Sequence, residues 1–410
     1  MRKIAILSTL TLFACGDKGD TGTGGTDDTG ISALECDDDV CVLSGVITED
    51  LTLTADTAWL LRGGVFVGDD INPTTLTVEP GTIVYGESST DGMLVVRRNS
   101  QILANGAADS PIVFTSSKAP GSRARGDWGG LILNGNAPIN VCAGDGEACE
   151  AYGEGGTGWY GGDDPTDSSG TLSYVRVEFA GTLISPDNEL NGIAFQAVGS
   201  GTTIDNIHVH MNADDGVEFF GGTAQATHVI VTGAGDDSLD WTDGWQGSAE
   251  YVVLQQYADA GDNGIEADNN GEDNSLEPRS NPSLSKLTII GVADSETSDL
   301  GILLREGTAV SIDDAVVVDF NEGCLDVDHA DTYAQFDAGQ LQLSNVTLSC
   351  ATAFYDDGDE DDNADTVQAV FDAGSGNEIA TITLDGFDSQ GNGGAVDGDD
   401  WTTWTEYPEN

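Results

Sequence analysis

A short acidic motif recurs along the chain, and its spacing constrains the fold more than any other feature. NADDGVEFF begins at Asn212, GDDSLDW at Gly235 and GDNGIEA at Gly261. Aligned on the glycine or serine within the motif, related segments follow at intervals of 24, 22, 26, 37 and 22 residues. The longest interval contains an insertion, residues 267–283. The aligned positions are Gly192, Gly216, Ser238, Gly264, Gly301 and Gly323. Such a period is typical of solenoids in which each repeat forms one coil.

Side chains alternate within each repeat as they do in a β-strand. The position after the aligned glycine is apolar throughout; its residues are Ile193, Val217, Leu239, Ile265, Ile302 and Cys324. A second alternating strand precedes each copy, as in SYVRVEF and NIHVHM. The Gly323 copy slips by about one residue or ends the pattern. No segment has the pattern of a long amphipathic helix.

These observations predict an all-β chain folded as a right-handed parallel β-helix. A propeller has repeats nearer 40 residues, and a sandwich would not repeat its side-chain columns. The right hand is expected because parallel crossover connections strongly prefer it. We expect a single domain over residues 36–410, with an N-terminal cap at 36–70 and a C-terminal cap at 372–410, because the end coils otherwise expose unpaired edges.

Several longer motifs resemble a known family. LTVEPGTIVYG, GDWGGLILNGNAPIN, LSYVRVEFAG and DDSLDWTDGWQG are similar to a family of bacterial surface lipoproteins with a pectate-lyase-like β-helix, and the resemblance runs from about Leu76 to Gly291. It implies the fold and a location in the cell envelope. It implies no activity, because none is securely assigned to that family.

The first residues have the layout of a secretory signal. Met1-Arg2-Lys3 is basic, and the apolar run that follows ends at Ala14-Cys15, which resembles a bacterial lipoprotein signal. The resemblance implies cleavage before Cys15 and its lipidation. By analogy with known lipoproteins, Gly16 after the cysteine favours the outer membrane. Residues 16–35 are rich in Gly, Thr and Asp, and this composition predicts a flexible tether.

Charge and cysteine content narrow the possible partners. The chain has 13 basic and 72 acidic residues and a formal net charge of −59, which argues against nucleic acid as a partner. Six cysteines remain after Cys15, an even number that suggests disulfides in an exported chain. Zinc is the alternative, but the chain has no CxxC motif. The expected pairs are Cys36 with Cys41, Cys142 with Cys149, and Cys324 with Cys350.

The acidic residues of the repeats should form ladders. Residues at equal phase in a solenoid lie about 4.8 Å apart, where two carboxylates repel by roughly 1 kcal/mol in water and more in a protein environment. Solvent, hydrogen bonds from turn N–H groups, or bound Ca²⁺ can offset this repulsion. We expect Ca²⁺ ligands among Asp214, Asp215, Glu218, Asp236, Asp237, Asp240, Asp262 and Glu266.

A second group lies on the preceding strand. Alternation places Arg176 beside His208 and Glu178 beside His210, on the outward side of neighbouring coils. Ordinary cross-strand pairing is one interpretation. The other is a ligand-binding face, on which Arg176, His208 or His210 is the only candidate base for a lyase. Trp245 and Trp159 are further candidates, for stacking on sugars at the surface, whereas the phase of Trp241 predicts the core.

Two functions follow. The first is a non-enzymatic lipoprotein of the outer membrane that binds Ca²⁺ and presents a face to a glycan or a cell-surface partner. The second is a Ca²⁺-dependent polysaccharide lyase or glycoside hydrolase. The scarcity of basic residues disfavours a lyase, which needs a positive cleft for acidic sugars. A hydrolase needs only two suitably spaced carboxylates.

Overall fold

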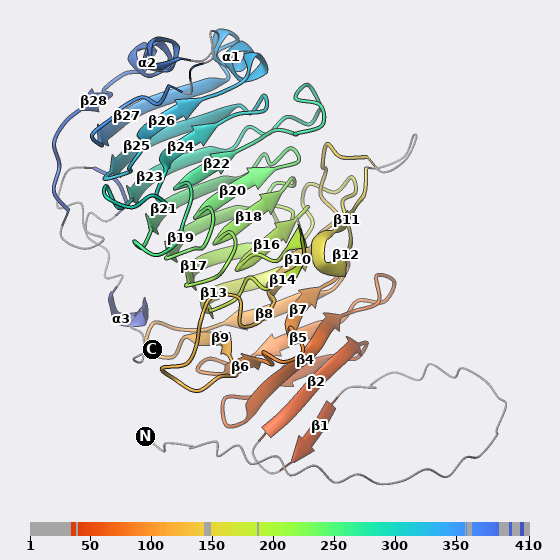
Figure 1. Ribbon diagram of the computed structural model, residues 1–410. Helices are drawn as coiled ribbons and strands as arrows, with labels where there is room; N and C mark the ends of the chain where they lie inside the picture. Colours follow the sequence, from red (N-terminus) through yellow and green to blue (C-terminus); the bar gives the residue numbers. More distant parts are fainter. Residues whose placement is uncertain are drawn as a thin grey trace.

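The computed structural model describes residues 34–37, 40–142, 149–186, 188–356, 358, 363–384, 393–395 and 402–405. The chain winds into stacked coils that form an elongated parallel β-helix (Figure 1). The predicted signal peptide, Cys15 and nearly all of the tether at 16–35 lie outside the described residues. No helix in the described part of the chain has both the length and the apolar character needed to cross a membrane.

One side of the solenoid is a sheet that we call the acidic sheet. Its strands run parallel, one per coil, and pair only with the coils before and after. They are β7 (Met93–Val96), β10 (Gly130–Asn134), β16 (Ile193–Gln196), β18 (Val217–Phe220), β20 (Leu239–Thr242), β22 (Ile265–Ala267), β24 (Leu300–Leu304) and β26 (Gly323–Val327).

The rest of each coil forms a second sheet, which we call the bent sheet. Its early strands are separate, and the later ones are long and continuous. The early strands are β3 (Leu51–Leu53), the first half of β4 (Ala58–Val67), β5 (Thr75–Val78), β6 (Ile83–Gly86), β8 (Gln101–Asn105) and β9 (Ile112–Ser116). The second half of β4 pairs with β7 in the acidic sheet. The later ones are β13 (Gly170–Glu178), β17 (Thr203–His210), β19 (Gln225–Thr232), β21 (Ser248–Gln255), β23 (Ser283–Ile290), β25 (Val310–Val318) and β27 (Leu341–Ser349).

Each long strand of the bent sheet turns at one recurring residue. The first half of β13 pairs with β8, and its second half pairs with β9. Between the halves, Tyr174 has φ 50°, and the equivalent residue of the next coil, Asn206, has φ 54°. Later coils repeat this left-handed conformation at His228, Tyr251, Lys286, Asp314 and Asn345. The bend makes the coil three-sided, which closes it around a core.

The register agrees with the predicted alignment. Val217 pairs with Ile193 on one side and with Leu239 on the other. In the last aligned copy, Ile302 pairs with Leu325 rather than with Cys324, so the expected one-residue slip is confirmed. The apolar column faces a continuous core, in which the Phe219 ring stacks on Phe195 with centroids 4.9 Å apart. Burial of this column is the main stabilisation expected of such a fold.

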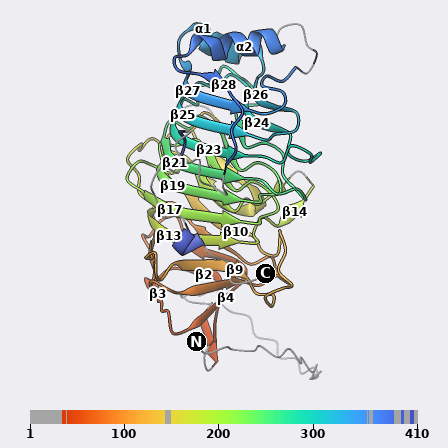
Figure 2. The ribbon, with the colours of Figure 1, turned by 90° about the vertical axis from the view of Figure 1, so that its left-hand side faces the viewer.

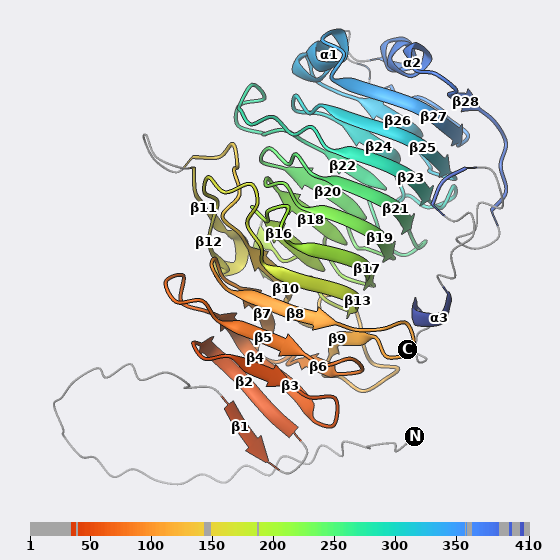
Figure 3. The same cartoon turned by 180° about the vertical axis from the view of Figure 1, so that it is seen from behind.

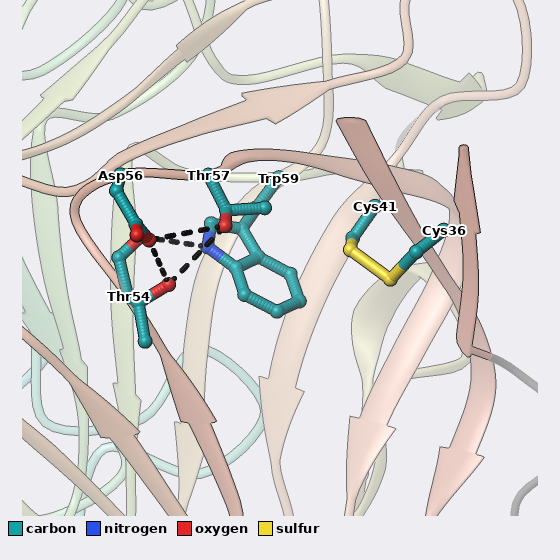
Figure 4. Close-up of a disulfide and its surroundings, with 6 residues drawn as sticks. All are labelled: Cys36, Cys41, Thr54, Asp56, Thr57 and Trp59. Atoms are coloured by element: carbon teal, nitrogen blue, oxygen red, sulfur yellow. Dashed lines mark hydrogen bonds between the residues drawn. A yellow bond between two sulfur atoms is a disulfide. The ribbon is translucent and has the colours of Figure 1, made fainter. Parts of the chain in front are cut away.

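The N-terminal end is closed by a short antiparallel pair, β1 (Leu34–Asp37) and β2 (Val40–Ile47), joined by the Cys36–Cys41 disulfide (Figure 4). Nearby, the indole of Trp59 donates a hydrogen bond to the Thr54 carbonyl at 3.1 Å. The other two predicted disulfides, Cys142–Cys149 and Cys324–Cys350, are confirmed as well.

The opposite end is covered by two helices. α1 (Ala330–Asp337) and α2 (Ala364–Ala373) lie over the last coil, where α2 buries Val367, Val370 and Phe371 (Figure 1). This arrangement differs from a cap that begins at residue 372. After β28 (Glu378–Ile379) the chain turns back along the side of the solenoid, and its last described element, α3 (Thr402–Thr405), lies against the bent sheet (Figure 2). The segment returns because Ala395 and Trp404 bury apolar surface there.

Candidate functional site

The outer face of the acidic sheet carries the predicted carboxylate ladder. Glu218 pairs in register with Asp240, and Asp240 with Glu266. Their strand neighbours Val217, Leu239 and Ile265 belong to the core, so the three acids lie on the opposite side of the sheet. The solenoid therefore makes neighbours of carboxylates that lie 22 and 26 residues apart in the chain.

The turns before these strands add more acids. The structure has three groups in which each carboxylate offers an oxygen within 4.8 Å of the others. They are Asp214–Asp215–Asp236, Asp215–Glu218–Asp240 and Asp236–Asp237–Asp262. All eight predicted metal ligands thus share one face, and seven of them belong to these groups; Glu266 lies beside Asp240. Metal binding by them stays a prediction.

Hydrogen bonds between coils hold two of the turn acids. The backbone N–H of Asp237 donates to the Asp215 carboxylate at 3.0 Å, and that of Asn263 donates to the Asp237 carboxylate at 2.7 Å. Each side chain therefore caps the next coil rather than its own turn. One oxygen of each carboxylate is committed in this way, and the second remains available for a ligand.

Burial and crowding raise the pKa of these carboxyls. Burial is the larger cause and neighbouring acids the second, and together they raise the pKa of Asp214 to about 7. The pKa of Glu218 and that of Asp240 are likewise raised, by burial first and then by Asp215 and Glu218, respectively. Without a counterion, the site therefore retains protons that exposed carboxyls lose near pH 4.

Two buried oxygens in the centre of the ladder lack a hydrogen-bond partner within the described structure. They are Oδ1 of Asn191 and Oδ1 of Asp240. The Asn191 side chain is only 3% exposed, and its amide nitrogen donates to the Glu218 carboxylate. Buried acceptors without donors are rare in folded proteins because they lose the free energy of hydration. These two oxygens are therefore acceptors that a hydrogen-bond donor or a cation could satisfy.

Sequence reasoning did not single out Asn191. A signal was present, because Asn191 immediately precedes Gly192 and so occupies the same phase as Asp215, Asp237 and Asn263. The alignment places an oxygen-bearing side chain at that position in four consecutive coils.

Arg305 lies at the end of the carboxylate ladder that carries Glu266. Its guanidinium forms ion pairs with Glu266 and with Asp268, the latter at 2.9 Å between Nε and Oδ1. Burial, the largest cause, and neighbouring acids raise the pKa of Glu266 to about 7 even though the Arg305 charge lowers it. The Glu266 rung is thus partly neutralised by the protein, whereas no basic side chain pairs with Glu218 or Asp240 among the described residues.

The predicted ligand-binding face around Arg176 and His208 differs from the acidic ladder. The pairs Arg176–His208 and Glu178–His210 form in the expected register, but all four side chains are buried. Arg176 forms an ion pair with Glu178. The expectation of an accessible ligand-binding face is therefore wrong, because neighbouring residues and the returning C-terminal segment cover it.

The cover over this face is largely aromatic. The ring of Trp404 meets His208 edge-on at 6.1 Å and Tyr174 at 5.6 Å. The Thr232 hydroxyl lies 3.0 Å from Nε2 of His208 and 2.9 Å from Nδ1 of His210. Burial lowers the pKa of His210 to about 3, so both imidazoles are neutral near pH 7. Neither Arg176 nor the histidines can reach a solvent-borne substrate.

The prediction that Trp245 lies at the surface is also wrong. It is 0% exposed and stacks on Phe219 with ring centroids 4.0 Å apart. A tight turn brings its ring back into the core, where its indole donates to the Ala224 carbonyl at 3.1 Å. Trp241 is buried, as its phase predicts.

The fold and the in-register acidic face define this molecule as a right-handed parallel β-helix with a carboxylate-rich sheet. The chain belongs to the pectate-lyase like beta helix domain family, whose model matches residues 45–406. No curated protein matches the chain.

Two solved structures are similar to this chain. One is the enzymatically active domain of tailspike protein 2 from bacteriophage CBA120, at 11% identity and TM-score 0.38, covering 80% of this chain and 42% of that one. The other is the catalytic domain of a GH87 alpha-1,3-glucanase in complex with tetrasaccharides, at 10% identity and TM-score 0.31, covering 82% of this chain and 64% of that one. This chain therefore spans less than two thirds of either neighbour.

Proposed function

We propose that the protein binds Ca²⁺ on the acidic sheet, with Asp215, Glu218 and Asp240 as carboxylate ligands and Asn191 as a neutral one. The observation that carries the proposal is the pair of unpartnered buried oxygens, on Asn191 and Asp240, within a close group of acids. A hard divalent cation takes six to eight oxygen ligands, including carboxylates, amide carbonyls and water. It would satisfy both oxygens and remove the repulsion along the ladder.

A cation also accounts for the pattern of charge compensation. The Glu266 rung already has Arg305, and Asp215 and Asp237 receive backbone N–H groups. Glu218 and Asp240, at the centre of the ladder, have no basic ion-pair partner in the described structure. The proposed ion lies where the protein supplies no countercharge of its own.

We further propose a non-enzymatic role: the protein presents this face to a glycan or another cell-surface partner. The burial of Arg176, His208 and His210 argues against the lyase alternative, since no accessible base remains among them. A glycoside hydrolase is the second candidate, because the raised pKa of Glu218 suits a general acid. The oxygens in each close group lie within 4.8 Å, which is below the roughly 6.5–9.5 Å between the carboxyls of inverting enzymes and nearer the roughly 5–5.5 Å of retaining ones, so a hydrolase here would be a retaining enzyme.

For the location, the proposal rests on the sequence alone. Cys15 would carry a lipid in the outer membrane, and residues 16–35 would separate the solenoid from the bilayer. Metabolic labelling with a fatty acid tests this. Label should enter the protein and disappear in Cys15→Ser, and an unlabelled wild-type protein would exclude the anchor.

Isothermal titration with Ca²⁺ tests the metal site. We expect saturable uptake at or below millimolar Ca²⁺ by the wild type, loss of it in Asp240→Asn, and at least about tenfold weaker binding in Asn191→Ala, because one ligand is worth more than about 1.4 kcal/mol. Asp109→Asn, which removes an exposed carboxylate between β8 and β9, is the matched control. Equal affinity in Asp240→Asn and Asp109→Asn would refute the site. A glycan panel assayed for new reducing or unsaturated ends separates binder from enzyme.

A further inference from the structure

Exposed apolar side chains gather on two neighbouring hairpins of the acidic side. The first hairpin joins β11 (Ala151–Gly153), the 3-10 turn η1 (Glu154–Gly156) and β12 (Gly158–Tyr160), and stands out from the coils (Figure 3). The second joins β14 (Leu183–Ser185) and β15 (Asn188–Glu189). Four of the large apolar residues that are exposed in the described structure lie on them: Tyr152, Trp159, Leu183 and Ile184.

Tyr152 and Trp159 form one aromatic surface. They pair across the two strands of the first hairpin, with ring centroids 5.3 Å apart in an edge-to-face arrangement. They are 58% and 42% exposed, and they are the two aromatic residues among the large exposed side chains of the described chain. Within the described residues, neither the Tyr152 hydroxyl nor the Trp159 indole N–H has a hydrogen-bond partner. Both rings thus offer an apolar side and a free polar group.

The surface is held rigidly although it is exposed. On the inner side of the hairpin, Tyr160 packs on Phe220 and donates its hydroxyl proton to Asp243 at 3.1 Å. Asn134, on strand β10, donates to the Thr157 carbonyl at 2.9 Å. A ligand that stacks on the outer side therefore meets a preorganised surface, so that little binding free energy is lost in ordering it.

The aromatic surface adjoins the acidic ladder. Glu154, two residues after Tyr152, is close enough to raise the pKa of both Glu218 and Asp214 by its charge. The backbone N–H of Gly155 donates to Asn188 at 2.7 Å, which ties the first hairpin to the second. Glu154 and Glu189, one on each hairpin, both act on the charge of Asp214 in the ladder, and they make this region strongly negative.

We infer that Tyr152 and Trp159 are a stacking subsite for the sugar rings of a neutral polysaccharide. The inference rests on the proposed role of the protein as a glycan binder and names the class of glycan. Pyranose rings have apolar C–H faces that match aromatic rings, and hydroxyls at their edges that match the two free polar groups. The surrounding carboxylates repel a uronic acid polymer but not an uncharged one.

Affinity electrophoresis with defined polymers tests the subsite. Laminarin, dextran, xylan and mannan are the neutral probes, and polygalacturonate and alginate are the anionic ones, each run with Ca²⁺ and with chelator. We expect at least one neutral polymer to retard the wild type, and Trp159→Ala or Tyr152→Ala to weaken that binding about tenfold, the scale of a binding hot spot. Trp159→Phe should retain most of it. Ile379→Ala, at an exposed apolar site on β28, is the control.

Three results would overturn the inference: no retardation by any neutral polymer, retardation by the anionic polymers alone, or neutral binding unchanged in the double alanine variant. An unchanged melting temperature of the variants shows that they remain folded. The calcium proposal fails separately. Asp240→Asn should lose Ca²⁺ uptake and keep neutral-glycan binding, whereas Trp159→Ala should do the reverse.

Discussion

The acidic sheet and the bent sheet both place ionisable side chains on their outer faces, yet they treat those charges in opposite ways. On the bent sheet, Arg176 is paired with Glu178, and the histidines are neutral and covered by Trp404. On the acidic sheet, Glu218 and Asp240 have only acids and amides around them. The first arrangement is self-sufficient, and the second requires protons or a cation. This contrast separates a structural polar cluster from a binding site.

The test with the largest expected effect replaces one ionisable side chain on each of the two sheets. Arg176→Met removes the nearer of the two basic partners of buried Glu178 and leaves Arg123 at 3.9 Å, so it should destabilise the protein by up to about 3–5 kcal/mol. Glu218→Gln, measured in chelator, should leave stability unchanged or raise it, because burial and neighbouring acids raise the pKa of Glu218 and glutamine reproduces the neutral form that they favour. Urea denaturation measures both. Similar destabilisation by the two substitutions would mean that the ladder is as well compensated as the bent sheet.

A smaller effect is expected from the cover of the bent sheet. Trp404→Ala removes a buried ring from Tyr174 and His208 and should cost about 2–3 kcal/mol, somewhat less than a tryptophan deep in a core. Trp159→Ala, on the exposed hairpin, should change stability by less than about 0.5 kcal/mol. Thermal melting of the two variants compares them. If Trp404→Ala melts like Trp159→Ala, the C-terminal segment does not stabilise the fold.

The two faces should also differ in the sign of their pH dependence. The pKa of Asp214 is raised to about 7 from its ordinary value of 3.8, so the folded state holds a proton that the unfolded state loses, and this stabilisation declines as pH rises from about 4 to about 7. For His210, the pKa falls from 6.5 to about 3, so its contribution is lost as pH falls through that range.

Metal-free melting between pH 4 and pH 7 separates these contributions. Asp214→Asn should reduce the decline in stability with rising pH, and His210→Gln should reduce the decline with falling pH. Saturating Ca²⁺ should abolish the first trend and leave the second. A common slope for both variants would show that the two faces do not titrate as the structure implies.

The smallest expected effect concerns Arg305. Arg305→Gln removes the positive charge nearest to the proposed ion and should raise Ca²⁺ affinity a few-fold, because a unit charge several ångströms away changes binding by about 1 kcal/mol. Titration calorimetry measures the change, with Arg62→Gln, on a pair far along the chain from the ladder, as the control. Weaker binding in Arg305→Gln would instead indicate that Arg305 orients Glu266 as a ligand.

Part of the acidic site could be predicted from the sequence repeat. The phase of Glu218, Asp240 and Glu266 predicted their contact, and the same phase predicts the position of Asn191. The sequence predicted Trp159 at the surface, but not its pairing with Tyr152, because the hairpin that carries both belongs to an insertion outside the repeat. The burial of Arg176 could not be predicted either, since the segment that contains Trp404 lies more than two hundred residues away in the chain.

By itself, the sequence determined the coil, the register and the side of the sheet on which each residue lies, because the alternation of a strand and the period of a solenoid are local properties. Only the tertiary structure decided which outward positions meet solvent. Outward and exposed are different properties in a solenoid, since loops and returning segments from remote parts of the chain can cover an outer face. Arg176 and Glu218 both point outward and are both buried, and the tertiary structure decided that the first pairs with an acid whereas the second has no basic partner among the described residues.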